Sequence, residues 1–227
     1  MGRPICTAVP TRHQVSVDGE TVVAVHHDGS SDRWVFFSHG FVSDKSGSYE
    51  SRCTQASEKG LQAVRFDHRG CGESDRSFGE QDFETRLADL QAVIEYFDPS
   101  ECILFGSSFG GKVAFHTAIS DSRVIGVAVR APVTRTKPFE NYRSLSESFF
   151  AALSRHPFER VEQQLDVPVA MFHGRDDETV PLDGTLDAIA GFKTDVLCAV
   201  YAGEGHRFSR DAENRMRDRL FAWIDDI

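Results

Sequence analysis

The feature that most constrains the fold is a regular alternation between short apolar runs and longer amphipathic stretches. The apolar runs cover residues 15–17, 22–26, 34–38, 63–66, 102–105, 124–129, 167–172 and 196–201. Helical spacing of apolar residues covers 49–59, 83–97, 108–119, 182–192 and 207–227. The first two runs flank an Asp-Gly turn and predict an antiparallel hairpin. Strands separated by helices predict an α/β fold with a mostly parallel sheet of about eight strands, covered by helices on both faces.

A length of 227 residues suits one compact domain, and no internal repeat or linker divides residues 1–227. The segment 132–166 interrupts the alternation and is rich in phenylalanine at helical spacing. Two interpretations remain open for it. It is either an ordinary crossover helix or a short lid over an active site.

A Gly-x-Ser-x-Gly motif, Gly106 to Gly110, lies between the apolar run 102–105 and a helical stretch. A strand, a tight turn and a helix form the setting in which the central serine, Ser108, becomes a nucleophile. Glycine is needed on both sides because the turn brings backbone against backbone. Ser107 lacks this pattern, since Phe105 stands where its first glycine would be.

The same segment also resembles a phosphate-binding loop, because Gly106, Gly111 and Lys112 fit Gly-x-x-x-x-Gly-Lys. Such a loop requires Ser or Thr next, to hold magnesium. Val113 stands there and cannot ligate a metal. The sequence therefore favours the nucleophile over the nucleotide site.

A serine nucleophile needs a histidine base and a carboxylate that orients the base. His206 follows a strand-like run in a Gly-Glu-Gly-His turn that gives its loop freedom to reach the sheet edge. Asp177 follows the run 167–172, at the carboxyl end of a predicted strand, where open parallel sheets bind ligands. The order Ser108, Asp177, His206 is the order expected of a hydrolase built on such a sheet. Asp176 remains the alternative carboxylate.

The oxyanion of an acyl-transfer intermediate needs backbone donors. The N–H of Phe109 directly follows the nucleophile at a predicted helix N-terminus. The loop after the run 34–38 is expected to supply the second donor, from Phe41, with Gly40 giving the backbone its freedom. His39 is expected to brace that loop.

Over nearly its whole length the chain resembles the α/β-hydrolase family. The matching segments are His39-Gly40-Phe41, residues 66–74 (Phe-Asp-His-Arg-Gly-Cys-Gly-Glu-Ser), 106–110, Gly174-x-x-Asp177-x-x-Val180-Pro181 and Gly205-His206. The resemblance implies that 66–74 is a structural turn and that Asp177 is preferred over Asp176. A serine nucleophile implies acyl transfer to water, and the small size is similar to that of esterases with a minimal cap.

We therefore expect a carboxylesterase that acts on small or aromatic acyl esters. A thioesterase, an aminopeptidase or amidase, and a ligand-binding protein with little turnover remain alternatives. Phe139, Tyr142 and Phe149 are expected to line the acyl pocket. Glutamates 140, 147, 159 and 162 are available to hold a substrate amine, although they equally fit a solvated helix face.

A net charge of −10 argues against nucleic acid or an anionic membrane as partner. The sequence has no apolar run long enough to span a membrane and no signal-peptide core, so a cytoplasmic location is expected. No metal motif occurs and the expected mechanism needs no cofactor. The expected partner is a small-molecule acyl substrate, and the sequence does not indicate an oligomeric state.

Overall fold

An eight-stranded sheet organises the chain in the computed structural model, which describes residues 9–135 and 147–227. The strands are β1 (Thr11–Val17), β2 (Glu20–His27), β3 (Trp34–Ser38), β4 (Gln62–Phe66), β5 (Cys102–Ser107), β6 (Val124–Arg130), β7 (Val169–Gly174) and β8 (Val196–Tyr201). Their order across the sheet is β1-β2-β4-β3-β5-β6-β7-β8. The β1–β2 and β2–β4 pairs are antiparallel, and every later pair is parallel. The predicted α/β fold with its N-terminal hairpin is confirmed.

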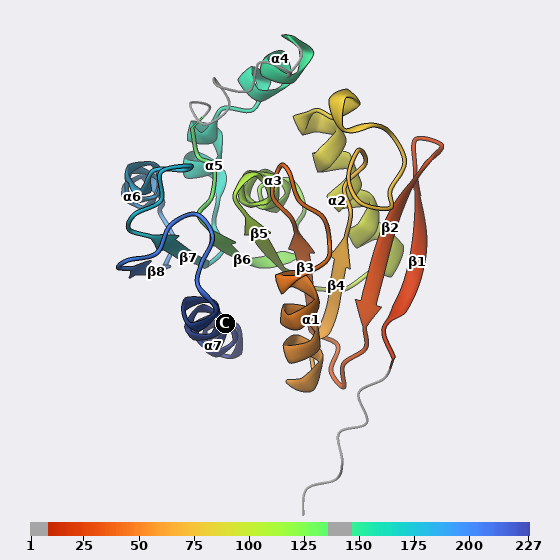
Figure 1. Cartoon of the computed structure of the whole chain (residues 1–227), viewed down its shortest axis with the longest axis horizontal. Coiled ribbons are helices and arrows are strands. Elements are labelled where there is room, and N and C mark those ends of the chain that lie inside the picture. The colour runs from red at the N-terminus through yellow and green to blue at the C-terminus, as the bar shows by residue number, and fades with distance from the viewer. Residues whose placement is uncertain (1–8, 136–146) are drawn as a thin grey trace, which may run out of the picture.

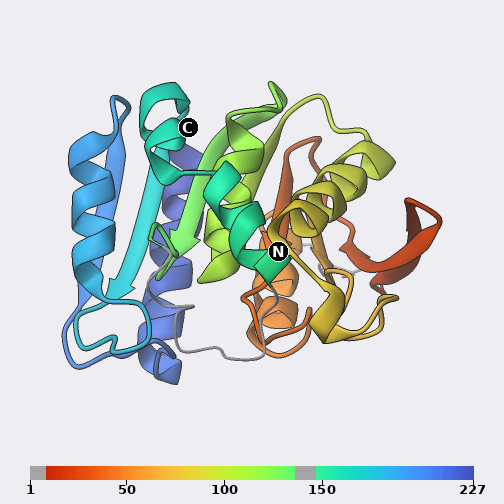
Figure 2. The ribbon, with the colours of Figure 1, turned by 90° about the horizontal axis from the view of Figure 1, so that it is seen from above.

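Helices cover both faces of the sheet (Figure 1). One face carries α1 (Ser48–Glu58) and α7 (Arg210–Asp226), below the sheet in the figure. The other face carries α2 (Phe83–Phe97), α3 (Phe109–Ala118) and α6 (Leu182–Gly191), which Figure 2 shows from above. Because strand side chains alternate between faces, the core divides into two apolar clusters, one under each helix layer.

Helix α2 illustrates how sequence gives this packing. Asp82 caps its first turn, with the Thr85 N–H donating to the Asp82 carboxylate at 2.7 Å. The expected apolar stripe is buried through Phe83, Leu90 and Ile94. The helix ends at Phe97, and the next residue, Asp98, has a left-handed φ of 49°.

The segment 132–166 contains α4 (Glu147–Arg155) and α5 (Phe158–Gln164) within its described part. Helix α4 packs against α2. A short 3₁₀ helix, η1 (Phe78–Glu80), precedes α2 and was not expected from the sequence. The lid stays a prediction, since residues 136–146 lie outside the described residues.

Helix starts differ from the predicted ones for local reasons. Helix α7 begins at Arg210 and not at 207, because Ser209 caps it by accepting from the Ala212 N–H at 3.2 Å. Helix α3 begins at Phe109 because Ser108 has a φ of 54°, which no helical residue adopts. The strands β3, β5, β6, β7 and β8 are mutually parallel, so their carboxyl ends meet at one edge of the sheet.

Candidate active site

Ser108 sits at the apex of the turn between β5 and α3, with φ 54° and ψ −119°. A left-handed φ at a non-glycine residue is strained and persists only where neighbours hold it. Here the Ser108 N–H donates to the Arg130 carbonyl at 2.8 Å, and the Ser108 carbonyl accepts from Val133 at 3.1 Å. Hydrogen bonds to the end of β6 and to the segment that follows it therefore fix the conformation of the turn.

The two glycines of the motif are required by close backbone contacts. A Cβ on Gly106 would lie 2.3 Å from the Gly110 carbonyl oxygen, and a Cβ on Gly110 would lie 2.3 Å from that of Ser38. Real Cβ atoms do not approach backbone atoms so closely. The motif thus packs the start of α3 directly onto the end of β3.

Asp177 and His206 come together from the loops after β7 and β8. His206 Nδ1 lies 2.8 Å from Asp177 Oδ2. An ionised carboxylate only accepts, so Nδ1 donates, and in a neutral imidazole Nε2 then remains an acceptor. Asp176 is exposed, and its backbone N–H donates to the Glu204 carbonyl at 2.9 Å. The structure places Asp177, and not Asp176, beside His206.

The Asp177 side chain is completely buried and kept ionised by its hydrogen bonds. Burial alone would raise its pKa, but hydrogen bonds from His173, from His206 and from the Val180 N–H hold the pKa well below its usual value. Asp177 Oδ1 accepts from the N–H groups of Thr179 and Val180, both at 2.9 Å. These donors also fix the direction of the carboxylate.

Backbone contacts lock the two loops to each other. Gly174 packs so tightly that a Cβ would lie 2.3 Å from the Glu204 carbonyl oxygen. The Arg175 N–H donates to the Tyr201 carbonyl at 2.8 Å. Gly203 has a φ of 76°, a conformation that favours glycine and turns the chain toward His206. The Asp177–His206 contact is thus supported by main-chain geometry.

A cavity of about 800 Å³ lies above this edge of the sheet. Both Ser108 and His206 line it, together with Gly40 and Phe41 from the loop after β3. The other lining residues include Tyr49 and Arg52 from α1, Arg130 from the end of β6, Phe208 from the loop after β8 and Glu213 from α7. The predicted nucleophile, the predicted base and the predicted Phe41 loop therefore face one hollow.

His39 holds the Phe41 loop from below. Its Nε2 accepts the His68 N–H at 3.0 Å, so its Nδ1 carries the proton and donates to the Gly40 carbonyl at 2.7 Å. Burial, with a smaller effect of His68 and then Arg86, holds the pKa of His39 well below its usual value. The imidazole of His39 is thus buried and neutral, and both of its nitrogens form hydrogen bonds. This agrees with the expectation that His39 supports the loop.

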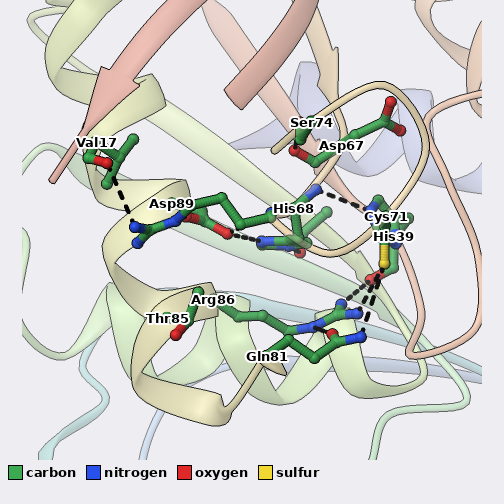
Figure 3. A network of polar contacts seen from close by, with 12 residues as sticks. Val17, His39, Asp67, His68, Cys71, Ser74, Gln81, Thr85, Arg86 and Asp89 are labelled. Carbon is green, nitrogen blue, oxygen red and sulfur yellow. Dashed lines mark hydrogen bonds and ion pairs between the residues drawn. The ribbon is translucent and has the colours of Figure 1, made fainter. Parts of the chain in front are cut away.

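Arg86, on α2, contacts the same loop and was missed by the sequence analysis (Figure 3). Its guanidinium is fully buried and reaches the carbonyl oxygens of Gly40 at 3.3 Å and Phe41 at 2.9 Å. Gln81 accepts from Arg86 Nε at 2.7 Å and orients it. No motif marks such a residue, and the only signal was a charged side chain within a predicted helix.

The three predicted pocket residues have different outcomes. Phe139 and Tyr142 lie outside the described residues. Phe149 is fully buried and is not among the residues that line the cavity. Its ring lies 5.4 Å from that of Phe41 and 5.8 Å from that of Phe109. Phe149 therefore packs behind the cavity wall, because α4 lies against α2.

Lys112 does not point toward the turn as a phosphate-loop lysine would. Its side chain is buried, Nζ donates to the His156 carbonyl at 3.2 Å, and it lies over the rings of Phe83 and Phe158. Within residues 9–135 and 147–227, no group of three or more His, Cys, Asp or Glu side chains is arranged to hold a metal ion. In the same part of the chain, no helix is both long and apolar enough to cross a membrane.

Comparison with known proteins identifies the relatives of this chain. Palmitoyl-protein thioesterase ABHD10 of Rattus norvegicus is 25% identical over 228 residues, covering 85% of this chain and 74% of the relative. The structure of mouse alpha/beta hydrolase domain-containing protein 10 superposes with a TM-score of 0.85 at 19% identity, covering 95% of this chain and 99% of that one.

Est1E of Butyrivibrio proteoclasticus, solved with ferulic acid, has a TM-score of 0.83 at 16% identity and covers 94% and 99% of the two chains. Both structural likenesses concern the fold. The family described as serine aminopeptidase, S33, matches residues 29–160, more than half of the chain. This protein is an α/β hydrolase and belongs to the S33 serine aminopeptidase family.

Proposed function

We propose that the protein is a serine hydrolase that cleaves carboxylic esters through an acyl-enzyme intermediate. The observation that carries the proposal is the 2.8 Å contact between Asp177 and His206, at the cavity that Ser108 also lines. A nucleophile, a base and a group that orients the base are the minimum set for this chemistry. Hydrolase activity agrees with the family to which the chain belongs.

In the first half of the reaction, Ser108 Oγ attacks the acyl carbonyl carbon. His206 Nε2 accepts the hydroxyl proton as the new C–O bond forms, and Asp177 stabilises the resulting imidazolium. The carbonyl oxygen becomes an oxyanion, which the N–H groups of Phe41 and Phe109 would hold. The start of α3 adds the positive end of a helix dipole at this point.

The first half ends when the tetrahedral intermediate collapses to the acyl-enzyme and the leaving group takes the proton from His206. Water then attacks the acyl-enzyme, giving its proton to His206, and the carboxylic acid leaves as Ser108 recovers the proton. Each proton that His206 accepts is returned within the cycle. In this scheme His206 carries out every proton transfer.

The charges of the cavity bear on the choice among substrates. An aminopeptidase needs a carboxylate to bind the α-amino group of its substrate, and Glu213 is the only Asp or Glu among the lining residues that the structure describes. Glu213 already pairs with Arg52 at 2.7 Å. Among the acidic residues considered from the sequence, Glu147, Glu159 and Glu162 do not line the cavity, and Glu140 lies outside the described residues. These facts favour ester over aminoacyl substrates.

A thioesterase is the second candidate, because the curated relative is named a palmitoyl-protein thioesterase. The same nucleophile and base serve esters and thioesters, so the site chemistry alone does not separate them. Hydrolysis rates of the phenyl ester, the S-phenyl thioester and the anilide of the same acyl group rank the three substrate classes. Repeating the comparison for acyl groups from acetyl to palmitoyl gives the preferred acyl length. A receptor-like protein would instead release product very slowly from all of them.

Labelling with a fluorophosphonate, followed by peptide mass spectrometry, tests the nucleophile. The wild-type chain is expected to carry the label on Ser108, and Ser108→Ala is expected to remain unlabelled. Ser107→Ala is the matched control, since Ser107 is the preceding residue and also lines the cavity. Equal labelling of wild type and Ser108→Ala would contradict the assignment.

A further inference from the structure

The lining of the cavity is rich in arginine, although the whole chain carries a net charge of −10. Four arginines line the cavity: Arg52, Arg130, Arg207 and Arg210. Arg207 and Arg210 are exposed at the rim, whereas Arg52 is buried. A basic cluster in an acidic protein focuses a positive potential into the hollow.

Arg52, on α1, is held rigidly. Its side chain is 1% exposed, and Nε donates to Glu213 Oε1 at 2.8 Å. The guanidinium also lies 4.8 Å from the ring centres of Tyr49 and Phe105. Its Nη1 is buried and has no acceptor within hydrogen-bond distance in the described part of the chain. Arg52 is thus fixed in place with hydrogen-bonding capacity left over.

Arg130, the last residue of β6, has fewer polar contacts than Arg52. Nη1 donates to the carbonyl oxygen of His206, and the guanidinium lies 5.4 Å from the ring centre of Phe208. Its Nε is buried without an acceptor, and no carboxylate of the described residues forms an ion pair with it. Burial, and then the nearby charge of Arg52, lowers the pKa of Arg130.

The available carboxylates do not neutralise these arginines. Glu213 is bound to Arg52, and Asp177 is directed to His206 and His173. Among the lining residues that the structure describes, four arginines therefore stand against one carboxylate, Glu213. Arg130 is half-buried without a charged partner, so its guanidinium has lost part of its water at a cost in free energy. A negatively charged ligand in the cavity would recover that cost.

We propose that the arginines that line the cavity bind an anionic group of the substrate, a carboxylate or a phosphate, while Ser108 attacks the acyl carbon. Guanidinium groups suit both anions because their paired N–H donors match two oxygens at once. The inference rests on the proposed function, and it narrows the substrates to esters or thioesters that carry a negative charge away from the scissile bond. That charge comes from the acyl chain or from the leaving group.

Two matched substrate pairs distinguish the sources. Monophenyl adipate and phenyl hexanoate share an acyl length, and only the first ends in a carboxylate. Hexanoyl-coenzyme A and hexanoyl-N-acetylcysteamine share the acyl group, and only the first has phosphates on its leaving group. We expect kcat/KM to be about tenfold or more higher for the anionic member of at least one pair. The pair that shows the preference identifies the position of the charge.

Variants assign the preference to the arginines. Arg130→Gln is expected to reduce the anionic-to-neutral ratio of kcat/KM about tenfold. The rim variant Arg207→Gln/Arg210→Gln alters only exposed side chains and is expected to reduce the ratio about threefold, so it decides the matter if Arg130→Gln does not fold. Arg160→Gln is the control, since Arg160 is an exposed arginine on α5 that does not line the cavity. Its ratio is expected to match wild type.

Failure of this inference differs from failure of the proposed function. A wild-type chain that is labelled at Ser108 and hydrolyses both members of each pair equally well keeps the hydrolase assignment and overturns the anion site. An unchanged ratio in the rim variant, together with an unchanged ratio in any folded Arg130→Gln, overturns it as well. Absence of both label and turnover would instead reject the serine hydrolase itself.

Discussion

The Arg86 guanidinium lies 3.3 Å from the carbonyl oxygen of Gly40, which belongs to the same peptide group as the N–H of Phe41. A peptide group is planar and its C=O and N–H point in opposite directions when it is trans. His39 Nδ1 donates to the same oxygen at 2.7 Å. Two buried donors therefore set the direction of the N–H that we propose as an oxyanion donor.

Arg86→Gln is expected to lower kcat by about 10- to 100-fold in the folded enzyme, with KM less affected, because a misdirected donor acts mainly on the transition state. Steady-state kinetics, normalised to sites labelled by fluorophosphonate, measures the effect. Arg69→Gln is the matched control. Arg69 is equally buried and pairs with Asp89 at 2.6 Å, but it does not contact the loop.

Arg69→Gln is expected to lower the free energy of unfolding by about 3–5 kcal/mol, since it leaves Asp89 buried without its partner. Its kcat per labelled site should stay near that of wild type. If both variants lost kcat in the same proportion, the effect would be general loosening of the network, and the loop would have no special dependence on Arg86.

Asp177→Asn is expected to reduce kcat by about 10³- to 10⁴-fold, because an amide no longer stabilises the imidazolium or selects the tautomer with the proton on Nδ1. Asp176→Asn is the matched control: that side chain is exposed, so kcat should change less than twofold. Initial rates on one activated ester compare the two variants. The opposite ranking would assign the carboxylate role to Asp176.

Local patterns in the sequence were sufficient to predict the sheet and to select the residues at its edge. The turn at Ser108 can be recognised in the sequence because close backbone contacts exclude a side chain at both Gly106 and Gly110. Asp177 and His206 could be inferred because each follows a strand, and parallel strands end at the same edge. These features depend on neighbours in the chain or on the topology of the fold.

The arginines that line the cavity could not be inferred in this way. Arg130 reaches the His206 carbonyl across 76 residues of sequence, and Arg52 meets Glu213 across 161. The Arg52–Glu213 pair depends on how α1 and α7 pack on the sheet, and the Arg130–His206 contact depends on how the loop after β8 lies over the end of β6. Periodicity specifies neither. The contact between the rings of Phe149 and Phe41 likewise depends on how α4 packs, which periodicity does not specify.

Gly110→Ala is expected to lower the free energy of unfolding by about 2–3 kcal/mol, because the new methyl group would meet the Ser38 and His39 carbonyl oxygens at 2.3 and 2.5 Å. Gly79→Ala is the control, since no atom lies within 4 Å of its Cβ position and its φ is not left-handed. That change should stay within about 0.5 kcal/mol. Urea unfolding measures both, and equal stabilities would contradict the packing described for the turn.

Acid is expected to destabilise the fold through its buried histidines. Burial lowers the pKa of His27 to about 4 and that of His116 to about 2, and it holds the pKa values of His39 and His68 well below the usual range. Between the lowered folded-state pKa and the ordinary value near 6.5, the unfolded chain binds a proton that the folded chain does not. Stability therefore rises with pH across this window and is lost as pH falls.

His116 gives the clearest test of that slope, because its Nε2 is buried without a hydrogen-bond partner in the described part of the chain. Each such histidine contributes up to ~1.4 kcal/mol per pH unit well below pH 6.5. His116→Leu removes one titrating group while keeping an apolar side chain against Phe83, whose ring centre lies 5.2 Å from the imidazole. Urea unfolding at pH 5 and pH 7 should show a smaller loss of stability in the variant, by about 2 kcal/mol over the two units. An identical loss in both proteins would mean that His116 becomes protonated in the folded state.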